Sequence, residues 1–262
     1  MWDPSTYQRY ADERSRPFVD LLARVGAEDP REVVDLGCGP GTQTAALPGR
    51  WPRARITGLD SSAEMIDRAR RLETPVRFEV ADVRDWRPGP RTDVVVANAL
   101  LQWVPGHDEL LRSWAAALPA GSWLAVQVPG NFTAPSHRAL YEVAGRPRWR
   151  DRVLPALRVD PVSEPAGYAE LLLDAGCDVQ AWETTYLHLL PAAGDAHPVL
   201  SWMEGTALRP VRAVLGDGPD WLTFRRELVA ELVRAYPVRA GRVLFPFRRI
   251  FFVARPGAEA GS

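Results

Sequence analysis

The residues with the clearest chemical potential lie where apolar segments end. Asp35 stands inside the apolar run 33–36, two residues before the first of three glycines at positions 37, 39 and 41. Residues without a side chain can adopt positive φ and let the backbone approach a ligand closely. The following segment has a helical pattern, whose unpaired N–H groups would attract a carboxylate. The pattern predicts a strand, a glycine turn and a helix that bind a nucleoside or its tail.

The glycine spacing separates two classes of nucleotide site. Gly37-Cys38-Gly39 fits the start of the Gly-x-Gly-x-x-Gly pattern of dinucleotide sites, but the third position is Thr42 and the glycine stands one residue earlier, at Gly41. An acid inside the strand is also unusual for a dinucleotide site. The stretch from Asp35 to Gly41 instead resembles the first motif of class I S-adenosylmethionine-dependent methyltransferases.

Two more acids end short apolar runs. Asp60 follows 56–59, about 20 residues beyond the glycines, where a carboxylate can accept from both ribose hydroxyls. Asp82 ends the run that begins at Val76, and the resemblance implies that it accepts from the adenine amino group. A single strand-end Asp is usually a turn or N-cap residue. Motifs in the expected order favour ligand roles for both acids.

The resemblance also implies a cofactor, S-adenosyl-L-methionine, with S-adenosyl-L-homocysteine as product. Asn98 and Trp103, after the run 93–97, would then lie near the transferred methyl group, although Trp103 could equally be a packing aromatic. Cys38 lacks an identifiable His-Asn/Asp set, so catalysis by its thiol is not expected. The implied cofactor residues are Asp35, Gly37, Cys38, Gly39, Asp60, Ser61, Met65, Asp82, Val83, Asn98 and Arg16.

Composition excludes several other classes. The 262 residues carry 32 basic and 33 acidic side chains, a formal net charge of −1, which argues against a generalised nucleic-acid surface. Two cysteines, no secretory leader and no long apolar segment lead us to expect a cytoplasmic protein and no membrane partner. A metal site is not expected, because the histidines are scattered: His107, His137, His188 and His197.

Predicted strands and helices alternate in the first half of the chain. We expect strands near 31–36, 54–59, 75–80, 92–97 and 121–128, with helices near 18–26, 62–71 and 107–118. Alternation of this kind implies right-handed crossovers, a mostly parallel sheet with helices on both faces, and a ligand beyond the carboxyl ends of the strands. The predicted class is α/β, a Rossmann-like fold with a seven-stranded sheet.

The second half interrupts this rhythm with Pro-punctuated helical segments. We expect an N-terminal lid over 1–30, a cofactor-binding core over 31–130, and late helical insertions that build an acceptor pocket. The insertions would span 131–176 and 187–247, the last strands 177–186 and 248–255, and a disordered tail 256–262.

A narrower resemblance extends over nearly the whole chain, to the trans-aconitate 2-methyltransferases. It rests on segments outside the glycine motif as well as inside it. These segments are Met1-Trp2-Asp3-Pro4-x-x-Tyr7, Arg14-Ser15-Arg16-Pro17-Phe18, Asn98–Val104, Val128-Pro129-Gly130-Asn131-Phe132-x-x-Pro135-Ser136-His137, Trp182–His188 and Phe245–Arg249. The resemblance implies esterification of one carboxylate of a tricarboxylic acid. Such a carboxylate is ionised at neutral pH, so the enzyme needs no base and acts by positioning.

Arginine is the residue type suited to hold the other carboxylates. Nine arginines face five acids between positions 204 and 249, and we expect a few of them to converge on the acceptor. Arg248 and Arg249 are neighbours on a strand, so at most one should point inward. The expected acceptor residues are Arg209, Arg248, Arg249 and Tyr7, with Tyr186 and His188 as hydrogen-bonding positions in the wall.

Three other readings stay open from the sequence. The same mechanism could act on another small acceptor, and a hydroxyl acceptor would need a nearby base. The chain could also bind the cofactor without catalysis. A nicotinamide oxidoreductase is disfavoured by the glycine spacing and by Asp82. The oligomeric state is not readable.

Overall fold

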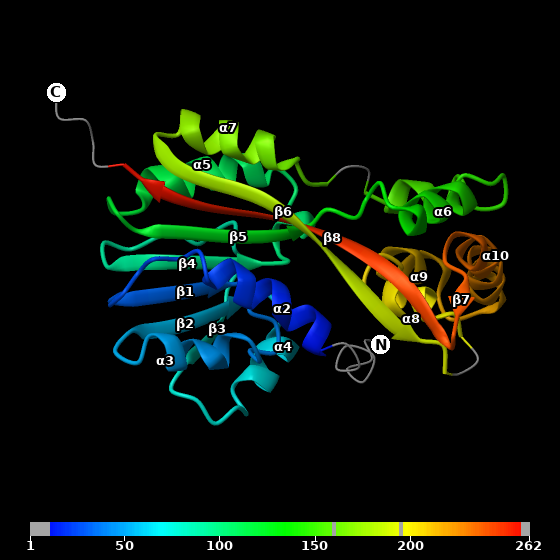
Figure 1. Cartoon of the computed structure of the whole chain (residues 1–262), viewed down its shortest axis with the longest axis horizontal. Helices are drawn as coiled ribbons and strands as arrows, with labels where there is room; N and C mark the ends of the chain where they lie inside the picture. The colour runs from blue at the N-terminus through cyan, green and yellow to red at the C-terminus, as the bar shows by residue number, and fades with distance from the viewer. Residues whose placement is uncertain (1–10, 159–160, 194–195, 258–262) are drawn as a thin grey trace. The chain divides into compact units, whose positions relative to one another are not determined.

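The computed structural model describes residues 11–158, 161–193 and 196–257. The chain forms two compact units (Figure 1). Among the described residues, the core unit comprises Ser15–Pro129, Val162–Thr184 and 249–257, and the helical unit comprises 11–14 and the described parts of Gly130–Pro161 and Thr185–Arg248. No helix in the described ranges has both the length and the apolar composition required to cross a bilayer.

The elements follow one another in the order α2 (Ala11–Leu22), β1 (Glu32–Leu36), η1 (Thr44–Ala46), α3 (Leu47–Arg50), β2 (Arg55–Asp60), α4 (Ala63–Ala69), β3 (Arg77–Val80), β4 (Thr92–Asn98), η2 (Leu101–Trp103), α5 (His107–Ala117), β5 (Trp123–Pro129), α6 (Pro135–Ala144), η3 (Leu154–Ala156), α7 (Pro165–Asp174), β6 (Cys177–Pro191), α8 (Pro198–Glu204), α9 (Arg209–Leu215), α10 (Pro219–Ala235), β7 (Val238–Arg239) and β8 (Arg242–Pro256).

The strands form one sheet in the order β3-β2-β1-β4-β5-β8-β6, and β7 pairs with β8. The pairs among β1 to β5 are parallel, whereas β8 runs antiparallel to β5. Parallel strands are buried on both faces, so their sequences are short, continuous apolar runs. Their positions can therefore be predicted well from the sequence. The sheet confirms the predicted α/β class and the parallel core.

Helices cover both faces of the core sheet. On one face, residues of α5 and α7 pack with Leu36, Ala97, Val126 and Phe252 in a continuous apolar cluster (Figure 1). On the other face, the chain after α2 lies against the sheet, since a Cβ added at Gly26 would meet the ring of Trp123 at 2.9 Å. Two hydrogen bonds join α3 to this chain, from Arg50 to the carbonyl of Val25 and from the Trp51 indole to Ala27.

The structure shifts two of the expected boundaries. Helix α7 belongs to the core unit, because Tyr168, Leu171 and Leu172 are buried in the core cluster, so the first helical insertion ends near 161 rather than 176. Strands β6 and β8 are each 15 residues long, well beyond the expected 177–186 and 248–255. The extra residues alternate exposed and buried positions, a weaker sequence signal than a continuous apolar run. The tail 258–262 lies outside the described residues.

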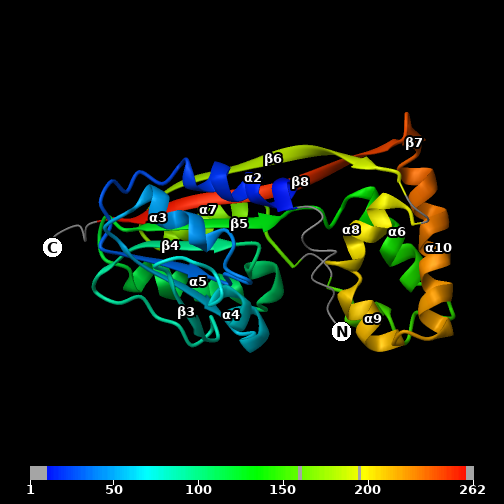
Figure 2. The ribbon, with the colours of Figure 1, turned by 90° about the horizontal axis from the view of Figure 1, so that it is seen from below.

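The helical unit has its own apolar core. Side chains of α6, α8, α9 and α10 pack with Trp149, Phe245 and Phe247, and Figure 2 shows α10 beside α6 and α8. Each of these four helices has proline at its first or second position. Proline fits there because the first helical N–H groups have no intrahelical acceptor. The prolines that recur through the second half of the sequence thus include the starts of these four helices.

Candidate functional site

The predicted cofactor residues gather at one edge of the core sheet. Asp35 in β1, Asp60 ending β2 and Asn98 ending β4 all come from the carboxyl ends of neighbouring parallel strands. Ligands of open α/β sheets bind beyond this edge, where the strand order reverses. Here the reversal falls between β1 and β4 (Figure 1). Strands β2 and β3 follow on the far side of β1, and β5 follows on the far side of β4.

The glycine turn after β1 has the predicted backbone conformation. Gly37, Gly39 and Gly41 have φ values of 71°, 56° and 76°. A Cβ at Gly41 would meet the Phe78 ring at 2.7 Å and the methyl group of Ala69 at 2.8 Å, so packing as well as φ excludes a side chain. A Cβ at Gly39 would meet no atom of the described residues within 4 Å. The backbone at Gly39 therefore faces open space, as close approach to a ligand requires.

Asp60 ties the glycine turn to the turn after β2. Its Oδ2 accepts from the backbone N–H of Gly39 at 2.9 Å, and its Oδ1 accepts from the N–H of Ser62 at 2.9 Å. Ser62 in turn caps α4, where its hydroxyl accepts from the Met65 N–H at 3.4 Å. A carboxylate has about four lone-pair sites, so Asp60 keeps acceptor capacity for a ribose. Ser61 is exposed beside it.

Asp35 has a different environment from Asp60. Its side chain is 3% exposed, and its Oδ2 accepts from the Thr44 hydroxyl at 2.6 Å. Burial raises the pKa of Asp35 to about 7, and the nearby Asp60 charge adds to the effect, whereas the Thr44 hydrogen bond opposes it. Asp35 thus joins the strand before the glycine turn to Thr44 after it. A cation at this site would draw the proton from its carboxyl group.

Cys38 is a small packing residue of the turn. Burial raises the pKa of its thiol well above the usual range, and the charges of Asp35 and Asp60 act in the same direction. The thiol therefore stays protonated at neutral pH, and only the thiolate is a good nucleophile. This agrees with the expectation that Cys38 takes no chemical part.

Asp82 follows β3 and pairs with a neighbour two residues on. The Arg84 guanidinium donates to both carboxylate oxygens, with Nε at 3.0 Å from Oδ1 and Nη2 at 2.5 Å from Oδ2. These hydrogen bonds lower the pKa of Asp82 to about 2. The sequence analysis did not predict this pair. An adenine amino group at Asp82 would share the carboxylate with Arg84 or displace it.

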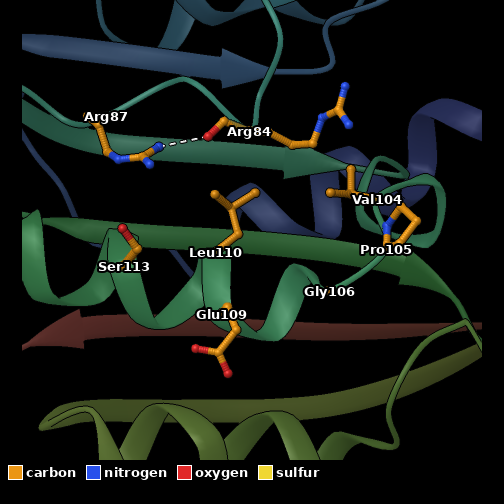
Figure 3. A pocket seen from close by; sticks show the side chains of 8 residues that line it. All are labelled: Arg84, Arg87, Val104, Pro105, Gly106, Glu109, Leu110 and Ser113. Carbon is orange, nitrogen blue, oxygen red and sulfur yellow. Dashed lines mark hydrogen bonds between the residues drawn. The ribbon is translucent and has the colours of Figure 1, made fainter.

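A pocket of about 240 Å³ lies next to this pair (Figure 3). Figure 3 shows the Arg87 guanidinium donating to the carbonyl of Arg84, a hydrogen bond of 2.9 Å. The remaining lining comes from Val104, Pro105, Gly106, Glu109, Leu110 and Ser113. None of the predicted cofactor residues lines this pocket, so it does not mark the centre of the cofactor site.

The end of β4 carries a strained turn between two predicted residues. Ala99 has φ of 56°, uncommon for a residue with a Cβ, and its N–H donates to the Gln127 carbonyl at 2.8 Å. Before it, Asn98 donates to Gln43 Oε1 at 2.9 Å. Beyond it, Trp103 in η2 is 41% exposed, more than a packing aromatic of the core. Strain of this kind is common at functional sites.

The structure adds two polar residues that the sequence did not single out. Gln43 follows the glycine turn and holds the Asn98 amide, and Gln127 is a fully buried glutamine in β5. Arg249 in β8 is only 7% exposed, and its Nη1 lies 3.5 Å from Gln127 Oε1. A glutamine within an apolar strand such as 123–129 is the signal that could have been noticed.

Two of the expected wall residues lie in the helical unit. His188 is 3% exposed, and its ring lies 4.9 Å from that of Trp202 and 6.0 Å from that of Phe247. Tyr186 stands on the same face of β6, with its ring 6.4 Å from that of His188. His188 is therefore part of an aromatic core, which favours a packing role over contact with a ligand.

The expected acceptor arginines differ in environment. Arg209 is exposed at the first position of α9, with no ion pair to any described residue. Arg248 is half buried, and its backbone N–H donates to Asn131 Oδ1 at 3.0 Å. Arg248 and Arg249 differ in burial as alternation requires, and Arg249 is the inward one of the pair. Arg16 is exposed on α2, and Tyr7 lies outside the described residues.

Comparisons with known proteins agree with this geometry. A family model described as a methyltransferase domain matches residues 7–182. A trans-aconitate 2-methyltransferase of Mycobacterium sp. (strain KMS) is 59% identical over 261 residues, which cover 98% of this chain and 100% of the relative.

Solved structures support the same fold. The YcgJ protein of Bacillus subtilis is similar with a TM-score of 0.60 at 12% identity, over 92% of this chain and 97% of that one. A phosphoethanolamine N-methyltransferase of Haemonchus contortus, solved with S-adenosyl-L-methionine, has a TM-score of 0.55 at 14% identity, over 93% of this chain and 53% of that one. Because sequence identity of 59% extends through both units, the chain belongs to the trans-aconitate 2-methyltransferases, a family of class I S-adenosylmethionine-dependent enzymes.

Proposed function

We propose that this protein transfers a methyl group from S-adenosyl-L-methionine to one carboxylate of trans-aconitate or a similar small polycarboxylate. The products would be a monomethyl ester and S-adenosyl-L-homocysteine. The observation that carries the proposal is the 59% identity to a trans-aconitate 2-methyltransferase across the helical unit as well as the core. Acceptor choice resides outside the shared core motifs, so identity there supports the same acceptor.

The cofactor residues fit this group in chemistry. When bound, S-adenosyl-L-methionine supplies an electrophilic methyl group on a positively charged sulfur. We infer that Asp60 accepts from the ribose hydroxyls, that Asp82 accepts from the adenine amino group, and that the turn at Gly39 approaches the ligand with its backbone. Ser61, Met65 and Val83 would border the nucleoside, and Arg16 would hold a carboxylate.

A carboxylate acceptor suits the acid–base character of the site. Its pKa near 4 leaves it ionised at neutral pH, so no residue must remove a proton. The raised pKa of the Cys38 thiol and the hydrogen-bonded state of Asp35 suit packing roles better than base catalysis. The residues would then act by holding the acceptor in line and excluding water, which can contribute on the order of 7–11 kcal/mol.

The acceptor carboxylates that do not react need cationic partners. We propose Arg209, Arg248, Arg249 and Tyr7 for this part, with Asn98, Trp103, Tyr186 and His188 as positioning residues. The burial of His188 among aromatic rings makes it the weakest of these. Two free thiols, Cys38 and Cys177, fit a reducing compartment, and we propose the cytoplasm.

The test is an acceptor screen with an isotopically labelled methyl donor. Purified protein is incubated with trans-aconitate, a panel of di- and tricarboxylates, and hydroxyl acceptors, and the products are identified by mass spectrometry. A labelled monomethyl ester formed most efficiently from trans-aconitate supports the proposal. Efficient turnover of a hydroxyl acceptor, or cofactor binding with no product from any acid, would refute it.

A further inference from the structure

The chain that leads from β5 into α6 carries two buried polar side chains with unpaired atoms. Asn131 is 3% exposed and Ser136 is 0% exposed. Among the residues that the structure describes, neither Nδ2 of Asn131 nor Oγ of Ser136 has a hydrogen-bond partner. Nearly all buried polar atoms of folded proteins are paired, so two unpaired atoms this close in sequence point to a bound group. Both residues belong to the helical unit.

The side-chain amide of Asn131 has a fixed orientation. Its Oδ1 accepts from the backbone N–H of Arg248 at 3.0 Å, next to the contact in which the Gly130 N–H donates to the Arg248 carbonyl at 3.0 Å. A backbone N–H only donates, so exchanging the amide oxygen and nitrogen would bring two donors together. The position of Nδ2 is therefore settled, and it keeps two hydrogens for a ligand.

Ser136 lies at the same end of α6 as Asn131. The Asn131 carbonyl accepts from the Ala134 N–H at 3.0 Å, and this turn leads into the helix, which begins at Pro135. The Ser136 N–H donates at 3.0 Å to the hydroxyl oxygen of Tyr236, the residue that ends α10. Figure 2 shows α6 and α10 side by side.

The Tyr236 hydroxyl adds a third donor. Its oxygen accepts from Ser136, so its own proton can be donated to another group. Tyr236 is 5% exposed. We call Asn131 Nδ2, Ser136 Oγ and Tyr236 Oη the α6 donor group.

The surroundings of the α6 donor group favour an anion. The amino-terminal end of a helix carries a partial positive charge. The first turn of α6 contains no acidic residue that would oppose this charge. The three donors are themselves uncharged, and His137 beside them is neutral at pH 7, because burial lowers its pKa to about 4. The group therefore suits an ionised oxygen and offers nothing to hold a cation.

We propose that the α6 donor group binds one carboxylate of the acceptor. A carboxylate has two oxygens with about four lone-pair sites, enough for an amide N–H and two hydroxyl protons. Hydrogen bonds to an ionised oxygen are also about twice as strong as those between neutral groups. The inference rests on the proposed function for the identity of the acceptor. It gives a binding role to residues of the helical unit, separate from the cofactor residues Asp35 and Asp60 of the core unit.

Ser136→Ala separates this role from a structural one. The hydroxyl oxygen has no hydrogen-bond partner in the described part of the chain, so its removal breaks no known contact of the fold. Folding stability, measured by urea denaturation, should stay equal or rise, because an unpaired buried polar atom is lost. A merely structural serine, or one that holds an internal water molecule, would leave acceptor binding unchanged.

Two further variants complete the set. Asn131→Asp keeps Oδ1 for the Arg248 N–H and replaces the donor with an oxygen that repels a carboxylate. Tyr141→Phe is the control, because it removes a hydroxyl from the same helix that donates to the Arg158 carbonyl at 2.6 Å instead. If Asn131→Asp fails to fold, Ser136→Ala decides the outcome.

Binding of trans-aconitate to protein saturated with S-adenosylhomocysteine is measured by titration calorimetry, alongside KM for trans-aconitate. We expect Ser136→Ala to raise Kd and KM by about 10- to 50-fold, and Asn131→Asp by more, because a hydrogen bond to a charged group is lost and, in the second variant, a repulsion is added. The affinity for S-adenosylhomocysteine should stay within about twofold in both variants, as should all values for Tyr141→Phe.

An unchanged Kd for trans-aconitate in folded Ser136→Ala protein that still forms the ester would overturn the subsite and leave the proposed function intact. An equal loss of S-adenosylhomocysteine binding would also overturn it, because the group would then serve the cofactor. Failure of the proposed function looks different. In that case trans-aconitate would bind with Ser136 dependence but form no methyl ester, and the subsite would stand.

Discussion

Asp60 accepts a hydrogen bond of 2.9 Å from the backbone N–H of Gly39, a residue 21 positions earlier in the chain. The contact joins the two turns that the sequence identified separately, after β1 and after β2. It holds the glycine turn in the conformation in which Gly39 faces open space. Asp60 therefore shapes the site in addition to any hydrogen bond that it offers to a ribose.

This double role predicts a large effect of Asp60 on cofactor binding. Asp60→Ala should weaken S-adenosylhomocysteine binding by about 1–3 kcal/mol, because the ribose hydroxyls and the Gly39 N–H lose their acceptor. Asp60→Asn keeps one acceptor and should lose less. Titration calorimetry measures both. Equal affinity in wild type and Asp60→Ala would remove Asp60 from the site.

Asp82 should contribute less than Asp60, because Arg84 already occupies its carboxylate. Asp82→Ala should weaken S-adenosylhomocysteine binding, by less than Asp60→Ala does. Arg84→Ala should leave affinity unchanged or raise it by up to about fivefold, since an exposed ion pair contributes little. With its pKa lowered to about 2, Asp82 stays ionised above about pH 4, so its contribution should be flat from pH 5 to 8. A greater loss at Asp82 than at Asp60 would reverse the ranking.

Asp35 should make folding stability depend on pH. Its folded pKa of about 7 lies above the unfolded value near 4, so between these values the folded state holds a proton that the unfolded state releases. Stability should therefore fall as pH rises from about 4 to 7, by up to about 4 kcal/mol, and level off above. In Asp35→Asn this component should vanish. Urea denaturation at pH 5 and pH 8 measures it, and equal pH differences in both proteins would contradict the assignment.

The exposed arginine of α9 provides a test of the acceptor proposal in the helical unit. If Arg209 holds an acceptor carboxylate, Arg209→Ala should raise KM for trans-aconitate or lower kcat/KM by about 10- to 200-fold, from about 1.5–3 kcal/mol for a charge-assisted hydrogen bond. Cofactor affinity should stay constant. The control is Arg212→Ala on the same helix, whose Nε lies 2.5 Å from Asp217 Oδ1. Normal kinetics in a folded Arg209→Ala protein would exclude Arg209.

The core strands were predictable because buried parallel strands leave apolar runs, and their starts and ends agree within a few residues. Strand β6 was harder, since its pattern beyond position 186 alternates exposed and buried residues like a surface strand. Helix α7 was assigned to the insertions because it lies in the Pro-punctuated segment and begins with a proline as they do, although its apolar face packs on the core sheet. Local sequence predicts an element but not the surface that it packs against.

The site shows the same division. Asp35 and Asp60 stand at strand ends, where topology alone brings them together. The Arg84–Asp82 pair depends on side-chain geometry alone. The Gln127–Arg249 contact depends in addition on the register between β5 and β8, which joins residues 122 positions apart in sequence. His188 was expected as a hydrogen-bonding residue of the pocket wall, and only the packing of Trp202 and Phe247 around it reveals its burial.

Substitutions at two glycines of the same turn should have different consequences, one for folding and the other for ligand binding. A side chain at Gly41 would collide with Phe78 and Ala69, so a substitution there would destabilise the folded protein. A Cβ at Gly39 would meet no atom in the part of the chain that the structure describes, and asparagine tolerates the φ of 56° at this position. An asparagine at position 39 would thus preserve the scaffold while filling the space that faces the ligand. One substitution could therefore abolish ligand binding while the protein stays folded. Such a folded, inactive protein could then acquire a different function under selection.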